Sequence, residues 1–157
     1  MRAAFFVDWD PQSLYSLQNN IKEITVVIPD WLTIDPQTYR LVSKIDPTIV
    51  TLAKANKVQI FPLLSNIIDG DFNSKLLSTT LSDPIKRKLL ISDIYNLLER
   101  EGFEGINIDF ENFTAADSTK IVQFQKELYT ELRKGKFMVT QDIIPEDSSY
   151  DVQSLAK

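Results

Sequence analysis

The chain has 157 residues, of which 17 are basic and 22 acidic, and its formal net charge is −5. It is 43% hydrophobic and 25% charged, which indicates one globular domain with a real core and excludes the disordered, collagen and coiled-coil classes. Net acidity without a basic block argues against nucleic acid as a partner, and no apolar run is long enough to cross a bilayer. Because Cys and His are absent, disulfides, thiol catalysis, Cys/His zinc sites and imidazole bases are excluded, and we expect no metal and no cofactor.

Five apolar runs with strand character recur along the chain, and helical patterns lie between them. The runs are residues 3–7, 24–28, 58–64, 105–111 and 137–140. Helical spacing predicts helices over 13–21 (capped by Ser13 or Asp10), 84–101 and 117–134, and part of 38–55, where Asp46-Pro47 opens a short helix. The helix over 84–101 is expected to bury one apolar stripe: Ile85, Leu89, Leu90, Ile94, Leu97 and Leu98. Residues 65–73 predict a polar loop with a simple turn at Asp69-Gly70-Asp71.

Strand–helix alternation at intervals of about 30 residues predicts an α/β fold with a parallel sheet. Two architectures fit: a doubly wound five-stranded sheet, or a partial TIM (β/α)8 barrel of about five βα units. A whole barrel takes about 250 residues, so residues 1–157 are expected to form a single domain holding strands one to five of eight. In either architecture ligands bind at the carboxyl ends of the strands. The polar and aromatic residues at those ends are Asp8, Asp10, Trp31, Asn66, Asp109, Glu111 and Asp142.

The fourth run, residues 105–111, alternates polar and apolar side chains. Asn107, Asp109 and Glu111 fall on one face, and the apolar residues between them fall on the other. Burying three polar side chains in a parallel strand is costly, which favours a functional role for this face. Asp109 and Glu111 lie about 6.6 Å apart along a strand, close enough for the carboxyls to meet and raise each other's proton affinity. Such a pair can act as an acid and its ionised partner near neutral pH.

Residues 104–111 also resemble the fourth-strand signature of glycoside hydrolase family 18, the chitinase-like barrels, which reads D-G-x-D-x-D-x-E. Glu104 stands at the first acid, Asn107 at the second, Asp109 at the third and Glu111 at the terminal glutamate. The Asn107 departure is usual in the branch that acts on bacterial cell-wall and spore sugars. Residues 4–10, 27–32, 61–66 and 139–145 resemble the family-18-like modules that are joined to polysaccharide deacetylase or glycosyltransferase domains in bacteria.

The resemblance implies retaining, substrate-assisted hydrolysis of a polysaccharide that contains β-linked N-acetylglucosamine. Glu111 would be the general acid, Asp109 would orient the acetamide of the sugar, and Asn107 would hold Asp109 by a hydrogen bond. The alternative is a non-catalytic carbohydrate-binding module, for which a general acid is not needed. A doubly wound nucleotide-binding domain is a third reading, but the chain has neither G-x-G-x-x-G nor a P-loop.

Further residues at strand ends are candidate substrate contacts. Trp9 and Trp31 offer indole faces that could stack on sugar rings, or else cover the core. Asp8 could bond sugar hydroxyls or cap the next helix, and Asn66 and Asp142 are polar groups at strand ends.

The segments that family barrels carry on their sixth strand, including a Tyr and an Asp, are not recognised after Tyr150-Asp151. We therefore expect a truncated barrel that is inactive or weak without the rest of its parent. Open sheet edges favour a homodimer. No targeting segment is recognised, so an extracytoplasmic or membrane-associated parent is expected from the family alone.

Overall fold

The computed structural model describes residues 1–144, 147 and 149–155. Its strands are β1 (Ala3–Phe6), β2 (Val26–Ile34), β3 (Leu41–Ser43), β4 (Gln59–Ile60), β5 (Leu63–Ser65), β6 (Ile67–Ile68), β7 (Asp71–Phe72), β8 (Gly105–Asp109) and β9 (Met138–Gln141). Its helices are α1 (Pro11–Asn20), α2 (Pro47–Ala55), α3 (Ser74–Ser82), α4 (Pro84–Glu101), α5 (Ala115–Leu132) and α6 (Val152–Leu155), with 3-10 turns η1 (Ile21–Glu23) and η2 (Arg133–Gly135).

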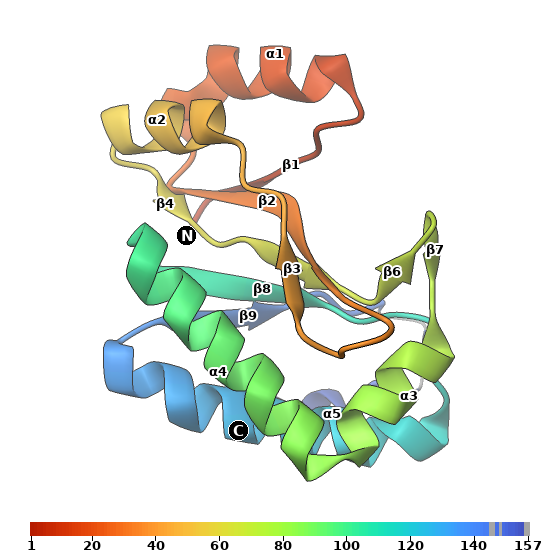
Figure 1. Cartoon of the computed structure of the whole chain (residues 1–157). Coiled ribbons are helices and arrows are strands. Elements are labelled where there is room, and N and C mark those ends of the chain that lie inside the picture. Colours follow the sequence, from red (N-terminus) through yellow and green to blue (C-terminus); the bar gives the residue numbers. More distant parts are fainter. Residues whose placement is uncertain (145–146, 148, 156–157) are drawn as a thin grey trace.

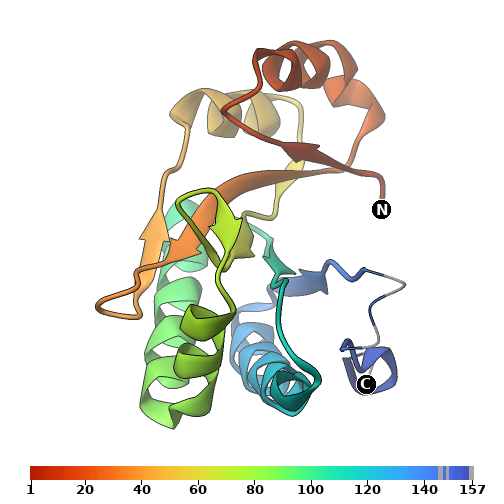
Figure 2. The ribbon, with the colours of Figure 1, turned by 90° about the vertical axis from the view of Figure 1, so that its right-hand side faces the viewer.

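The main sheet has the strand order β1-β2-β5-β8-β9, and every neighbouring pair along it is parallel. Spatial order thus follows chain order, whereas a doubly wound sheet reverses direction around its first strand. The strands form an arc with the helices on its outer side, and the arc is open between β1 and β9 (Figures 1 and 2). The predicted parallel α/β fold is confirmed, and its architecture is an unclosed barrel wall.

The third predicted strand is divided in two by Pro62. β4 pairs with β2, and β5 pairs with both β2 and β8. Proline has no N–H to donate to a ladder, so pairing lapses around it. Its carbonyl still accepts a hydrogen bond from the Asn107 N–H at 3.1 Å, which keeps the divided strand aligned with β8.

The outer face of the sheet and the helices share one continuous apolar core. Asp10, Asp46 and Asp83 cap α1, α2 and α4, each followed directly by a proline in the first turn. The stripe predicted on α4 is partly wrong: Ile85 is 70% exposed, and Leu89 is also exposed. The buried face of α4 comprises Arg87, Leu90, Ile91, Ile94, Leu97 and Leu98. None of the helices in the described part of the chain is long and apolar enough to span a membrane.

The segments outside the main sheet agree with expectation in part. Part of residues 38–55 was predicted as helical, and the helix α2 confirms this from Pro47 onward. Before it, β3 forms an antiparallel hairpin with β2, and Asp35 closes the turn by accepting from the Gln37 and Thr38 N–H groups. The predicted simple turn at Asp69-Gly70 is confirmed as the tip of the β6–β7 hairpin. The helix α3 was not predicted, because its sequence is rich in Ser and Thr, which are weak helix formers.

The inner, concave face of the sheet has its own small apolar cluster, formed by Val26, Ile28, Phe61 and Leu63. Gly105 belongs beside it for a steric reason. A Cβ at position 105 would lie 2.6 Å from the Met138 carbonyl oxygen and 3.0 Å from the Phe61 ring. Glycine therefore lets Phe61 close the floor of the inner face below the polar residues of β8.

Candidate active site

The two faces of β8 are separated as the sequence predicts. Ile106, Ile108 and Phe110 are fully buried in the core on the helix side, where Phe110 packs against Phe124 with ring centroids 5.6 Å apart. Asn107 lies level with Leu63, and Asp109 level with Ser65, on the inner face. The polar side chains of the fourth strand therefore meet in the concavity of the arc.

Glu111 lies just beyond the last residue of β8, where the chain leaves the sheet. Asn112 turns the backbone with a φ of 56°, a left-handed conformation that Asn adopts more readily than most residues. The Asn66 carboxamide binds both backbone groups of Glu111: Nδ2 donates to its carbonyl and Oδ1 accepts from its N–H, each at 3.0 Å. Asn66 is 0% exposed. Its side chain thus cannot reach a ligand in the concavity, and the predicted substrate contact is replaced by a contact to Glu111.

Asn107 makes different hydrogen bonds from those expected. Its Nδ2 donates to Asp142 at 2.7 Å, and its Oδ1 accepts from the Thr140 hydroxyl at 2.7 Å. Both partners are on the segment that includes β9, which pairs with β8 so that Thr140 lies opposite Asn107. Asn107 therefore holds Asp142, and the predicted hydrogen bond from Asn107 to Asp109 is not among the bonds the structure shows for this side chain.

Asp109 is the most perturbed carboxyl of the group. Burial raises its pKa to about 7, with further contributions from the negative charges of Glu111, Asp142 and Asp30 and from a hydrogen bond to Glu111. Burial also raises the pKa of Asp142, although the Asn107 amide opposes the shift. The Asp109 carboxyl therefore keeps its proton up to about neutral pH, and a hydrogen bond joins it to Glu111.

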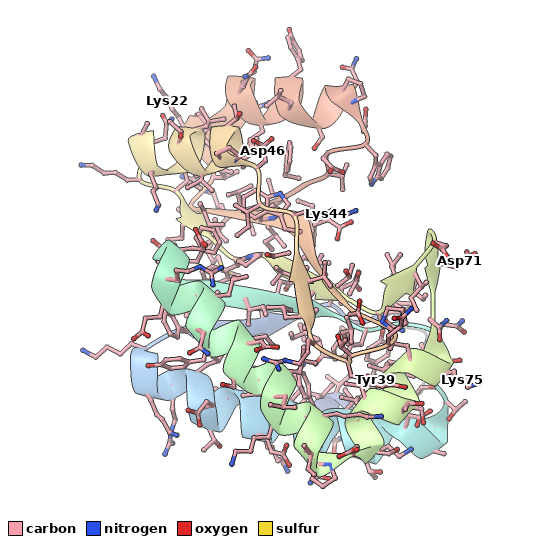
Figure 3. The ribbon with its side chains drawn as sticks, viewed as in Figure 1. Lys22, Tyr39, Lys44, Asp46, Asp71 and Lys75 are labelled. Atoms are coloured by element: carbon pink, nitrogen blue, oxygen red, sulfur yellow. The ribbon has the colours of Figure 1, made fainter. Side chains whose placement is uncertain are left out.

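Two groups outside the predicted set complete this electrostatic environment. Burial, and then the charge of Asp8, raise the pKa of Asp30, while Lys44 at the end of β3 lowers it (Figure 3). Burial and the nearby carboxylates, with Glu111 first among them, raise the pKa of Tyr150. Asp30 and Tyr150 were not among the predicted site residues, although Asp30 lies in the segment 27–32 that resembles the family. Asp30 was detectable in principle, since it alternates with Val26 and Ile28 on β2.

Of the remaining predicted residues, Trp9 is exposed, whereas Trp31 is buried and Asp10 and Glu104 bond to the backbone. Trp9 is 75% exposed beyond the carboxyl end of β1, so its indole face is free to contact a ligand. Trp31 is 3% exposed and packs against Phe103 on the helix side, so the prediction that it contacts a sugar is wrong. Asp10 caps α1 by accepting from the Gln12 N–H at 2.9 Å. Glu104 accepts from the Ile60 N–H at 2.9 Å, at the opposite end of β8 from Glu111.

The site as a whole offers a hydrogen-bonded pair of carboxyls, a further carboxyl held by an amide, and an exposed indole. Among the described residues, no group of three or more Asp or Glu side chains is arranged to hold a metal ion. The arrangement suits general acid catalysis together with stabilisation of a positive charge that develops on a substrate.

The sequence profile described as "Glycosyl hydrolases family 18" matches residues 2–157. The chain belongs to glycosyl hydrolases family 18. Among curated relatives, it is 26% identical over 101 residues to the cortical fragment-lytic enzyme of Bacillus cereus, covering 64% of this chain and 23% of that protein. It is 29% identical over 104 residues to the uncharacterized glycosylase YvbX of Bacillus subtilis, covering 65% of this chain and 30% of that protein.

Solved structures share the fold of this family 18 chain. The spore cortex-lytic enzyme SleL of Bacillus cereus matches with a TM-score of 0.87 at 17% identity, over 98% of this chain and 37% of that chain. A class V chitinase of Nicotiana tobaccum in complex with NAG4 matches with a TM-score of 0.79 at 20% identity, over 99% of this chain and 49% of that chain. The chain spans only 20–30% of the length of the curated relatives it matches.

Proposed function

We propose that this chain carries the acid–base residues of a glycosidase that hydrolyses polysaccharides containing β-linked N-acetylglucosamine. The observation that carries the proposal is the hydrogen-bonded pair of Asp109 and Glu111 on the inner face, with the pKa of Asp109 raised by burial to about 7. Family membership supports the reaction class, and the NAG4 complex of a chitinase with the same fold supports the sugar.

In the first step, the Glu111 carboxyl donates its proton to the glycosidic oxygen. The bond between that oxygen and the anomeric carbon breaks, and the carbonyl oxygen of the substrate's own N-acetyl group bonds to the anomeric carbon. Asp109 accepts a hydrogen bond from the acetamide N–H and stabilises the positive charge of the oxazolinium that forms. Its closeness to Glu111 lets the pair keep one proton while the other carboxyl is ionised.

In the second step, water attacks the anomeric carbon as Glu111 takes a proton from it. The bond to the acetamide oxygen breaks, which restores the N-acetyl group and leaves the anomeric configuration retained. Asn107 acts indirectly, because its amide fixes Asp142, one of the charges that raise the pKa of Asp109.

The second candidate function is a carbohydrate-binding module without hydrolysis. The observation that favours it is the free indole of Trp9, since an exposed aromatic face at the end of a parallel strand is suited to stack on a sugar ring. The two functions differ in whether Glu111 is needed after the sugar is bound.

The deciding experiment compares Glu111→Gln with wild type on N-acetylglucosamine oligomers, using the chain and any longer product its gene encodes. Glu104→Gln is the matched control, because Glu104 contacts the Ile60 backbone at the far end of the same strand. We expect the chain alone to be weak or inactive, and Glu111→Gln to lower turnover in the active form by about 100- to 10,000-fold, as is typical for loss of a general acid. Binding by wild type and Glu111→Gln without hydrolysis by either would favour the binding module.

A further proposal concerns the two edges of the arc. Within the described residues, β1 and β9 each pair on one side only, and the exposed side chains of Phe5 and Met138 lie on these strands. Such edges recruit further strands. We propose that two copies of the isolated chain associate through them, and a monomeric mass by light scattering across a tenfold concentration range would contradict this.

A further inference from the structure

Asn66 makes a bidentate contact to the peptide of Glu111. The Glu111 N–H requires an acceptor and its carbonyl requires a donor, so only one orientation of the carboxamide satisfies both bonds. The second Nδ2 hydrogen is directed to the Asn73 carbonyl at 3.2 Å. Both Nδ2–H groups of Asn66 therefore donate a hydrogen bond, and the side chain is fully buried.

This contact replaces the hydrogen bonds that a sheet would supply. β8 ends at Asp109, and Asn112 turns the chain away with its left-handed φ, so neither neighbouring strand reaches the peptide of Glu111. A carboxamide carries a donor and an acceptor like a peptide group. Here the Asn66 side chain takes the place of a neighbouring strand and bonds the backbone N–H and carbonyl of Glu111. The position of Glu111 relative to the last strand residue thus depends on Asn66.

A second tie holds the residue before Glu111. The Tyr150 hydroxyl donates to the Phe110 carbonyl at 2.9 Å, and the Tyr150 ring packs edge-on against Phe113 with centroids 4.7 Å apart. The Phe110 carbonyl, the Glu111 N–H and the Glu111 carbonyl are therefore all held by side chains from distant parts of the chain. Asn66 supplies two of these three contacts.

We propose that Asn66 is a positioning residue, which fixes the backbone of Glu111 so that its carboxyl stays in hydrogen-bonding reach of Asp109. The inference rests on the proposed function, in which these two carboxyls share a proton. Under this proposal Asn66 acts on the reaction indirectly, by positioning Glu111, and does not contact the sugar.

A purely structural alternative is that Asn66 only closes the β6–β7 hairpin. The Asn73 N–H donates to the Asn66 carbonyl at 2.9 Å, and the Asn66 side chain returns a bond to the Asn73 carbonyl. Asn73→Ala separates the two roles. It removes the side chain that caps α3 by accepting from the Leu76 N–H, yet it keeps every backbone contact to Asn66 and does not touch Glu111.

The experiment needs no substrate, so its result is independent of whether the chain hydrolyses any sugar. NMR of the chain measures amide hydrogen exchange of Glu111 and the titration of the Asp109 carboxyl carbon in wild type, Asn66→Ala and Asn73→Ala. In Asn66→Ala we expect the Glu111 amide to exchange about tenfold faster, as on loss of one ordinary hydrogen bond. We also expect the Asp109 midpoint to fall as the Glu111 carboxyl moves away, but to stay above 4 because burial remains. In Asn73→Ala we expect both to stay at the wild-type values.

Equal behaviour of Asn66→Ala and Asn73→Ala, or a wild-type midpoint in Asn66→Ala, would overturn the proposal. If Asn66→Ala does not fold, Asn66→Asp replaces it, because the carboxyl keeps the acceptor for the Glu111 N–H while its ionised form loses the donor to the Glu111 carbonyl. We expect an intermediate fall of the Asp109 midpoint in that variant, and an unchanged midpoint would again overturn the proposal. Hydrolysis by the active form with no effect of Asn66 would remove the positioning role and leave the proposed function intact.

Discussion

The two faces of β8 show how one short strand serves opposite purposes. On the helix side, Ile106, Ile108 and Phe110 are completely buried among apolar side chains, and the hydrophobic effect stabilises them there. On the inner side, Asn107 is equally buried, but Asp109 sits among other carboxyls in a place where ionisation is unfavourable. The comparison shows that the outer face stabilises the fold. On the inner face, burial of Asp109 raises its pKa to about 7 and lowers the stability of the fold where this carboxyl is ionised.

The largest expected effect comes from deleting a side chain of the outer face. Phe110→Ala leaves a cavity against Phe124, and we expect the free energy of unfolding to fall by about 3–5 kcal/mol in urea denaturation. Tyr15→Ala is the control, because Tyr15 is 67% exposed on α1 and its loss should cost less than about 0.5 kcal/mol. Equal losses in the two variants would contradict the distinction between the packed outer face of the sheet and the solvent-exposed surface.

Arg87 is a buried cation in the outer layer, and its loss should have the next largest effect. The Arg87 guanidinium bonds both carboxylate oxygens of Glu127, at 2.9 and 3.0 Å, and the Leu81 carbonyl at 2.6 Å, so it joins α3, α4 and α5. We expect Arg87→Ala to lower the free energy of unfolding by about 2 kcal/mol, since a buried carbonyl loses its donor. Arg100→Ala is the control: it breaks an exposed pair with Glu101 and should change the free energy of unfolding by less than about 1 kcal/mol.

The contribution of Asp109 to the free energy of unfolding should change with pH in the opposite sense from that of an ordinary salt-bridged acid. The folded-state pKa of Asp109 is about 7, above its unfolded value near 4, so its contribution to stability is present below pH 4 and is lost as the pH rises through 7. We therefore expect Asp109→Asn to raise the free energy of unfolding by about 1–2 kcal/mol at pH 8, with a much smaller gain at pH 4. The same gain at both pH values would show that burial of the charge is not the cause.

The smallest expected effect lies at the start of α5, in the outer layer. Burial would raise the pKa of Asp117, but hydrogen bonds from Lys120, Thr114 and Ser78 outweigh it and lower this pKa to about 2. Its stabilisation is therefore present above the unfolded pKa near 4 and lost as the pH falls through 2. We expect Asp117→Asn to lower the free energy of unfolding by about 1 kcal/mol at pH 7 and to flatten its dependence on pH between 4 and 2.

Much of the outer layer could be predicted because its signals are local. Alternation along residues 105–111, the prolines that open α2 and α4, and Gly102 in a left-handed conformation after α4 all depend on near neighbours in the chain. The strand order was left open between two architectures, since sequence spacing is the same in both. It is decided by contacts between strands far apart in the sequence.

The site was predicted in part, and its errors have a common physical origin. Asp109 and Glu111 lie together as the alternation indicates, although β8 ends at Asp109 and the backbone of Glu111, just beyond it, is held by Asn66. Asn107 and Asn66 were given the wrong partners, since their hydrogen bonds run to Asp142, just after β9, and to Glu111, just after β8, across 35 and 45 positions of the chain. Trp31 was expected near the strand end, but β2 continues to Ile34 and keeps the indole inside the core.

The most direct test of the central claim is an NMR titration of the Asp109 carboxyl carbon in wild type and in Glu111→Gln. The account predicts a midpoint of about 7 in wild type, and a lower one in Glu111→Gln that still exceeds 4 because burial remains. Glu104→Gln should leave the wild-type midpoint in place. A wild-type midpoint near 4 would contradict the account, because Asp109 would then be an ordinary solvated carboxylate that shares no proton with Glu111.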